Sequence, residues 1–308
     1  MEGAGTGRGS GILTGTDATR NQARLAGLLY VLAGSTAPFA YLYVPDLLLA
    51  PGGPLAIADR VRASEGLLRA AIFCELYGAT LLVFATLALY QLFKRVDPKM
   101  SALMAALMLV SVPISYVNAL NHVAPLLLVK NPALASAFGP GPVAAQVTLF
   151  LRLHNYGLVI NQIFWGLWLF PIGVLVLRSG FMPRWVAYPL FFAGTGYVLN
   201  SLGTLLLPPS LRWITASLQI LGVGELPFDF YLMIRGIRGP ATDRVAAWLV
   251  VTSFAMGFAA LVLLLRHRID AIQYGVLALV SLVVLLGAAM RWRSESRGLA
   301  TDNVGDGA

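Results

Sequence analysis

The stretch GLLRAAIFCELYGATLLVFATLALYQLF at residues 66–93 decides the fold, because it is a long apolar run with very little charge. A helix needs about 20 apolar residues to cross the roughly 30 Å of hydrocarbon in a bilayer. Further runs of this length cover residues 22–45, 100–128, 146–177, 185–207, 211–234, 245–265 and 271–290. Only 12% of the chain is charged, whereas soluble domains average about 25%. The sequence therefore predicts an all-α integral membrane helical bundle with about eight transmembrane helices.

The basic residues indicate how these helices are oriented. If the N-terminus lies inside the cell, 14 of the 22 Lys and Arg residues fall on inner segments. Because the positive-inside rule places such an excess in the cytoplasm, we expect both termini to be cytoplasmic. The expected organisation is a disordered tail at residues 1–19, a six-helix membrane core at 20–239, an added two-helix pair at 240–293 and a second disordered tail at 294–308.

The net charge of +8 does not indicate a nucleic-acid partner. The basic residues lie at helix ends, where they set topology and attract anionic lipid headgroups. The single cysteine, Cys74, excludes a disulfide framework. The sequence contains no phosphate-binding loop, dinucleotide glycine fingerprint, nucleophile elbow or zinc-protease helix. We therefore expect membrane lipid as a partner and no cofactor.

Ionisable residues gather inside the predicted spans. They cost several kcal/mol in hydrocarbon, so they normally face a bundle interior or a wet cavity. Burial penalises the charged form of a carboxyl group, which makes such an acid a candidate proton donor. The candidate catalytic residues are the acids Glu75, Glu225 and Asp229 and the possible bases His122 and His154. For each acid the alternative is a structural ion pair between helices.

Other polar and aromatic side chains at similar depth are candidate substrate-binding residues. Arg152 would anchor an anionic group or pair with an acid, and aromatic rings would stabilise a developing cation or simply pack. The candidates are Arg152, Asn118, Asn121, Asn155, Asn200, Tyr77, Tyr116, Tyr156, Trp165 and Tyr197. Together with the acids, they predict one shared cavity in the outer half of the membrane. Glu65 and Arg69, spaced i and i+4 on one helix, are expected to form a structural pair.

The two histidines leave a metal site open as a further alternative. His122 and His154 lie at matched depths on neighbouring spans, where they could ligate a metal or a haem. No single helix carries a pair of histidines at ligand spacing, so hydrogen bonding or general-base chemistry is the preferred interpretation. We accordingly predict no metal.

Prolines and glycines mark the irregular parts of the chain. Residues 46–64 and 131–142 are rich in both, and we expect residues 46–64 not to form a helix. These two connections are predicted to be plain connectors or a lid. Pro227 lies between Glu225 and Asp229 and is expected to kink the sixth span by freeing the carbonyl of Val223.

Four segments resemble a bacterial family of multi-pass membrane proteins known as domain of unknown function 4386. They are ARLAGLLYVLAG at 23–34, ASEGLLRAAIF at 63–73, LHNYGLVINQIFWGLWLFPIGVLVLRSGFMPR at 153–184 and GELPFDFYLMIRGIRG at 224–239. The resemblance covers about residues 20–239 and implies a six-span core located in the bacterial plasma membrane. It also implies that Glu65, Arg69, His154, Gly157 and Glu225 belong to the family pattern. It implies no activity.

Three functions fit these features. The first is a cofactor-independent membrane enzyme that protonates a lipophilic substrate, for example an isoprenoid, by analogy in plan with membrane-bound terpene cyclases. The second is a proton-coupled transporter of a small amphiphile. The third is a non-catalytic scaffold whose polar layer only joins helices. The sequence leaves the substrate and the oligomeric state open.

Overall fold

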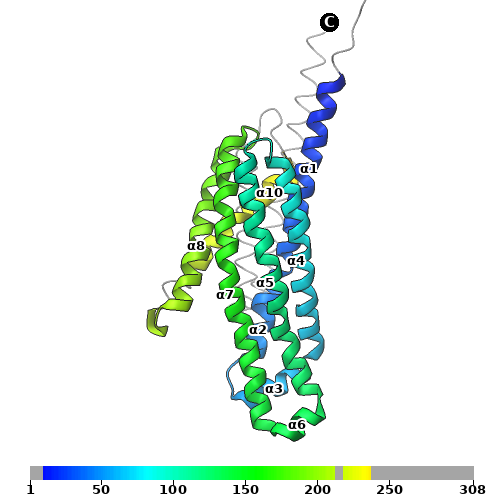
Figure 1. Ribbon diagram of the computed structural model, residues 1–308, viewed down its shortest axis with the longest axis vertical. Coiled ribbons are helices and arrows are strands. Elements are labelled where there is room, and N and C mark those ends of the chain that lie inside the picture. The colour runs from blue at the N-terminus through cyan, green and yellow to red at the C-terminus, as the bar shows by residue number, and fades with distance from the viewer. Residues whose placement is uncertain (1–9, 212–217, 237–308) are drawn as a thin grey trace, which may run out of the picture. The chain divides into compact units, whose positions relative to one another are not determined.

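The computed structural model describes residues 10–211 and 218–236. In this part of the chain every regular element is a helix (Figure 1). The long helices are α1 (Ser10–Ser35), α4 (Glu65–Phe93), α5 (Pro98–Lys130), α7 (Pro140–Ser179) and α8 (Ala187–Leu206). The short ones are η1 (Pro38–Tyr43), α2 (Val44–Leu48), α3 (Pro54–Ala63), α6 (Pro132–Phe138), η2 (Arg184–Val186), η3 (Pro209–Leu211), η4 (Leu218–Glu225) and α10 (Leu226–Arg235). The predicted all-α class is therefore confirmed for the described residues.

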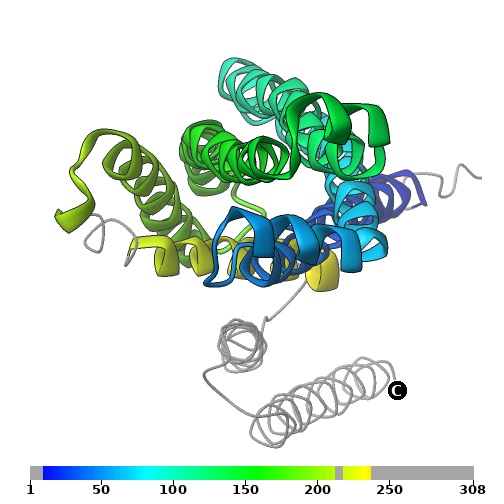
Figure 2. The same ribbon diagram turned by 90° about the horizontal axis from the view of Figure 1, so that it is seen from below.

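The helices pack side by side in a ring. Helix α1 contacts α4, α4 contacts α5, α5 contacts α7, and α7 contacts α8. Helix α8 contacts η4, and α10 returns to α1, which closes the ring (Figure 2). Successive long helices run in opposite directions, with the N-terminal end of α1 at one end of the bundle and α3 and α6 at the other (Figure 1). This arrangement surrounds an interior to which each long helix contributes side chains.

Four of the helical segments are long and apolar enough to cross a membrane. They are Thr19–Leu48, Glu65–Phe93, Pro98–Lys130 and Pro140–Ser179, and they correspond to the first four predicted spans. Helix α8 corresponds to the predicted span 185–207 but is not one of these four segments; it carries Pro189, Asn200 and several glycines. The predicted span 211–234 corresponds to η3, η4 and α10, with residues 212–217 outside the described part. The predicted spans 245–265 and 271–290 also lie outside the described residues.

The connection at residues 46–64 differs from our prediction, because it contains the ten-residue helix α3. Gly53 precedes this helix and Pro54 occupies its first turn, where a missing N–H costs nothing and the fixed φ suits the helix. Arg60 of α3 donates hydrogen bonds to the carbonyls of Leu48 (3.1 Å) and Ala50 (2.5 Å). This side chain ties α3 to the end of α2. Similarly, the connection at 131–142 holds α6 and the first residues of α7.

Prolines also change the helix type within two predicted spans. A π-helical turn begins at Pro38 and carries Tyr41; such turns are frequent at functional sites. The expected kink at Pro227 takes the form of a change from the 3₁₀-helix η4 to α10, directly after Glu225. At the N-terminus, α1 begins at Ser10, within the stretch predicted to be a tail.

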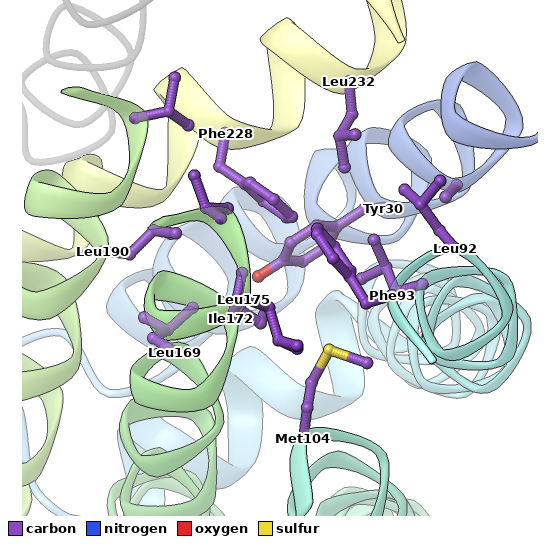
Figure 3. Close-up of a cluster of buried hydrophobic side chains, with 14 of the residues drawn as sticks. Tyr30, Leu92, Phe93, Met104, Leu169, Ile172, Leu175, Leu190, Phe228 and Leu232 are labelled. Carbon is purple, nitrogen blue, oxygen red and sulfur yellow. The ribbon is translucent and has the colours of Figure 1, made fainter. Parts of the chain in front are cut away.

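Two apolar clusters fill the ring. One surrounds Tyr30, Phe93, Trp168 and Phe228 (Figure 3). The other lies among α2, α3 and the adjoining halves of α4, α5 and α7 and includes Leu48, Val61, Leu68, Leu126 and Val147. On α4, α5 and α7 the residues between the two clusters include half of the buried polar side chains of the described residues, namely Glu75, Ser111, Asn118, His122, His154 and Asn161. The candidate sites lie in this layer and along its border.

Candidate functional site

Glu75, His122 and His154 form a buried cluster at the meeting point of α4, α5 and α7. Their exposed fractions are 4%, 1% and 0%. Atom Oε1 of Glu75 lies 2.8 Å from Nδ1 of His122 and 3.1 Å from Nε2 of His154. The two imidazole rings stack with their centroids 3.5 Å apart and their planes 17° apart. One ligand-capable atom from each residue lies within 4.8 Å of the other two.

A close approach between α5 and α7 positions the two histidines. A Cβ atom on Gly157 would lie 1.9 Å from Oδ1 of Asn118, so any larger residue at this point of α7 would have to displace the Asn118 amide or the helices. Asn118 donates a hydrogen bond from Nδ2 to the carbonyl of His154 (3.0 Å), and Asn121 donates to Oδ1 of Asn118 (3.1 Å). Asn118, which lies one turn before His122 on α5, therefore holds the α7 backbone at His154.

Glu225 forms a second site at the end of η4. The hydroxyl of Tyr30 on α1 donates a hydrogen bond to Oε2 of Glu225, and Tyr197 on α8 lines the same cavity as this carboxyl group. Tyr30 packs edge-on against Trp168 with the ring centroids 5.2 Å apart. Two phenol groups and an apolar shell therefore surround this acid.

A cavity of about 140 Å³ opens beside Glu225. Its wall is mostly apolar and aromatic, and it includes Tyr30, Tyr41, Trp165, Trp168, Tyr197 and Glu225. Tyr41 and Trp165 stack across the cavity wall with their centroids 6.0 Å apart. An apolar cavity of about 150 Å³ in another protein holds one benzene molecule, so this one has room for a ligand portion of five or six carbons.

The single shared cavity expected from the sequence therefore divides into two sites. The cavity beside Glu225 is lined by Trp165 and Tyr197 but not by Glu75 or the histidines. Tyr41 belongs to the cavity wall beside Glu225. The prediction that His122 and His154 serve the same cavity as Glu225 is therefore wrong.

Four predicted binding residues point away from both sites. Arg152 is exposed, and Tyr77, Tyr116 and Tyr156 have exposed fractions of 38%, 38% and 39%. Each lies two residues from an inward-facing side chain: Glu75, Asn118 or His154. Two residues along a helix rotate a side chain by about 200°, which turns it to the opposite face. The prediction for these four residues considered only their depth in the membrane, and not the face of the helix on which each side chain lies.

The remaining predicted residues have local partners or border the sites. Asn200 is buried and donates a hydrogen bond to Gln162 (2.8 Å), whereas Asn155 is half-buried. Asp229 is buried one turn beyond Glu225 but is not part of the cavity wall. Glu65 contacts both Arg69 (2.7 Å) and Lys130 (2.6 Å), so the expected pair joins the start of α4 to the end of α5.

The sequence analysis missed two aromatic residues of the first span. Tyr30 supplies the hydrogen bond to Glu225, and Tyr41 stacks with Trp165 in the cavity wall. A signal was present, because Tyr30 is the one side chain with a polar atom in the run LAGLLYVLAG at 25–34. Its partner lies 195 residues away, and no pattern within one helix indicates such a contact.

Residues 25–236 match the family described as "Domain of unknown function (DUF4386)". The chain belongs to this family. A similar relative is a protein of Archaeoglobus fulgidus described as uncharacterized, which is 33% identical over 112 residues, covering 33% of this chain and 64% of the relative's length. No solved structure matches the chain. The family spans the whole described ring and assigns no chemistry to either site.

Proposed function

We propose that this chain is an integral membrane enzyme that acts by acid/base chemistry on a lipophilic small molecule bound beside Glu225. The observation that carries the proposal is a buried carboxyl group, held by Tyr30, in the wall of an otherwise apolar and aromatic cavity. An ionised carboxylate is expensive to bury without a cation. The hydroxyl of Tyr30 donates a hydrogen bond to this carboxyl group and carries no positive charge, so the proposal takes the neutral acid as the form present in the cavity.

The cavity favours an alkene as the reacting group. Transfer of the Glu225 proton to one alkene carbon would leave a carbocation on the neighbouring carbon and a carboxylate on Glu225. The faces of Trp165 and Trp168 would stabilise the cation. The carboxylate would then remove a proton from an adjacent carbon, which restores the acid. The net result is a double-bond shift. If the π electrons of a second alkene in the substrate attack the cation first, a C–C bond forms, the charge moves to the second alkene, and loss of a proton beside it completes a ring closure. Neither route changes the composition of the substrate, so no cofactor is required.

The volume of the cavity limits the substrate. About 140 Å³ accommodates one isoprene-sized unit, not a folded chain of 15 carbons. We therefore favour isomerisation or cyclisation at one end of an isoprenoid over cyclisation of an entire long chain.

The alternative function, proton-coupled transport, predicts movement of a substrate across the membrane without any change in its bonds.

An experiment in deuterated water tests the chemistry directly. The purified full chain in lipid nanodiscs is incubated with farnesol, geranylgeraniol and undecaprenol, and each lipid is examined by mass spectrometry and by NMR. We expect deuterium at alkene-derived carbons, lost by at least tenfold in Glu225→Gln and retained in Glu65→Gln. Deuterium incorporation that is absent, or equal in the wild type and Glu225→Gln, contradicts the proposal. Unaltered farnesol that crosses a sealed vesicle along a pH gradient would favour the transporter.

The proposed setting is the bacterial plasma membrane, with about eight spans and both termini in the cytoplasm. Its support is the excess of Lys and Arg at one set of helix ends, which includes Arg178 and Arg184. A Cys74→Ala protein with a new cysteine at Ala300 tests this orientation in spheroplasts. A membrane-impermeant thiol reagent should label Ala300→Cys only after the cells are opened, and labelling of intact spheroplasts contradicts it.

A further inference from the structure

The cluster of Glu75, His122 and His154 is separate from the cavity beside Glu225 and is not used by the chemistry proposed there. Three helices bring it together, and the side chains are 3%, 1% and 0% exposed. Burial of an acid with two imidazoles is costly unless their polar atoms are satisfied. The cluster is therefore stable only if its polar atoms bind hydrogen-bond partners or an ion.

Direct hydrogen bonds do not satisfy the cluster. Nδ1 of His122 and Nε2 of His154 both approach the same oxygen of Glu75, at 2.8 and 3.1 Å. These distances are short enough for hydrogen bonds, yet all three atoms are buried without a hydrogen-bond partner among the described residues. The two rings also stack, so their donor atoms approach Glu75 from the same side of α4. Three possible ligand atoms this close together, each buried, suit a shared cation.

The spacing of the ligand atoms fits a metal ion. Metal–nitrogen and metal–oxygen bonds to zinc and similar ions are about 2.1 Å long. Two such ligands at a right angle are therefore about 3.0 Å apart, and at a tetrahedral angle about 3.4 Å apart. The observed separations of 2.8 and 3.1 Å match adjacent ligands at right angles.

The donor set selects the class of metal. Imidazole suits zinc, iron, copper and nickel, whereas calcium and magnesium prefer sites built from oxygen alone. Two histidines and one carboxylate on one face of an ion leave further positions open, an arrangement typical of non-haem iron(II). We propose that Glu75, His122 and His154 bind one divalent first-row transition-metal ion, with iron(II) favoured by the right-angle spacing.

The surroundings of the cluster keep its geometry fixed. Asn118 holds the backbone of His154, and Gly157 permits the contact between α5 and α7. Both ring nitrogens of His154 lack a hydrogen-bond partner among the described residues, so either lone pair is available to an ion. Nothing in this arrangement depends on the chemistry of Glu225, and the two proposals can fail independently.

Metal analysis of the purified full chain tests the proposal. The protein should carry an affinity tag without histidines, since a polyhistidine tag binds the same metals. We expect about one equivalent of iron or another divalent first-row metal per chain, with less than a tenth of that amount in His122→Asn and His154→Asn. The matched control is His267→Asn, because the chain contains three histidines and His267 is not in the cluster.

Cobalt provides a second measurement that does not depend on the metal acquired in the cell. Co²⁺ added to chelator-treated wild type should produce visible absorption bands and raise Tm, and neither should occur in His154→Asn. Circular dichroism and gel filtration identify variants that fail to fold. If a histidine variant fails to fold, Glu75→Gln replaces it in the test, because this substitution preserves the shape of the side chain. Metal content that is equal in folded wild type and folded cluster variants, or cobalt bands that persist in them, would overturn the proposal.

Discussion

The two buried acids of this bundle differ in the partners that surround them. Glu75 meets two imidazoles, which are metal ligands and proton acceptors, in a densely packed layer. Glu225 meets the phenol of Tyr30, which donates a hydrogen bond, and borders open space. The same carboxyl group therefore has different chemistry in the two places: it is suited to hold a cation at Glu75 and to deliver a proton at Glu225. The two proposals therefore differ because of the partner residues, and not because of the acid or its depth.

The largest expected effect comes from Trp168, which belongs to the Glu225 site alone. It is fully buried and packs against Tyr30, so Trp168→Ala leaves a large cavity. We expect the free energy of unfolding in detergent to fall by about 3–5 kcal/mol. The control is Trp165→Ala, a half-buried ring whose loss should cost less. The folded variant should keep the metal content of the wild type, and loss of the metal would show that the two sites are coupled.

Gly157 gives the reciprocal test, because it shapes the Glu75 site alone. A Cβ atom here would overlap Asn118, so Gly157→Ala must push α5 and α7 apart or displace the amide. Overpacking of this kind costs about 1–3 kcal/mol. We expect a lower Tm and a weaker affinity for Co²⁺, while deuterium transfer at Glu225 persists. Gly66→Ala is the control, since no atom lies within 4 Å of its added Cβ; equal effects of the two substitutions would refute the packing argument.

Tyr30→Phe tests whether the phenol and the acid at the second site act together. The substitution removes the hydroxyl that donates to Glu225 and leaves the buried carboxyl less satisfied. Loss of one partner of a buried hydrogen bond costs about 1–3 kcal/mol. A double-mutant cycle with Glu225→Gln should show a coupling energy of at least about 0.5 kcal/mol from thermal or chemical unfolding. Strictly additive effects would mean that the phenol stabilises α1 independently of Glu225.

The sequence predicted the helices well and the sites in part, and the contrast has a physical reason. A membrane helix can be recognised from its own sequence, because it is a continuous run of apolar residues. The first four predicted spans match the four segments that are long and apolar enough to cross a membrane. The direction of a side chain follows from its position along the helix. Arg152 and Tyr156 could have been excluded on this basis, because they lie two residues on either side of His154.

The pairing of side chains from different helices could not be predicted in the same way. His122 and His154 come from α5 and α7, and their stacking depends on the contact at Gly157. Tyr30 and Glu225 come from opposite ends of the described chain and meet because α10 closes the ring against α1. Such contacts depend on the order of helices around the ring, and a single sequence with no internal repeat leaves that order undetermined.

The smallest expected effect concerns Asp97, an acid at the rim of the bundle that serves as a reference for the two buried ones. It caps α5 by accepting hydrogen bonds from the backbone N–H groups of Met100 and Lys99, and it forms an ion pair with Arg178 at the end of α7. The N–H of Met100 and then the Arg178 guanidinium hold the pKa of the Asp97 carboxyl below its usual range.

Because the folded-state pKa of Asp97 is lowered, its contribution to stability is present above the unfolded-state pKa of about 3.9 and is lost as the pH falls through the folded-state value. Asp97→Asn keeps a good helix cap but removes the charge. We expect this variant to melt slightly below the wild type at pH 7, with the difference vanishing on acidification below pH 4. Solvent and salt screen this exposed pair, so 1 M salt should reduce the difference as well. A difference in Tm that is unchanged by acid and by salt would show that Asp97 acts only as a cap, without a contribution from its charge.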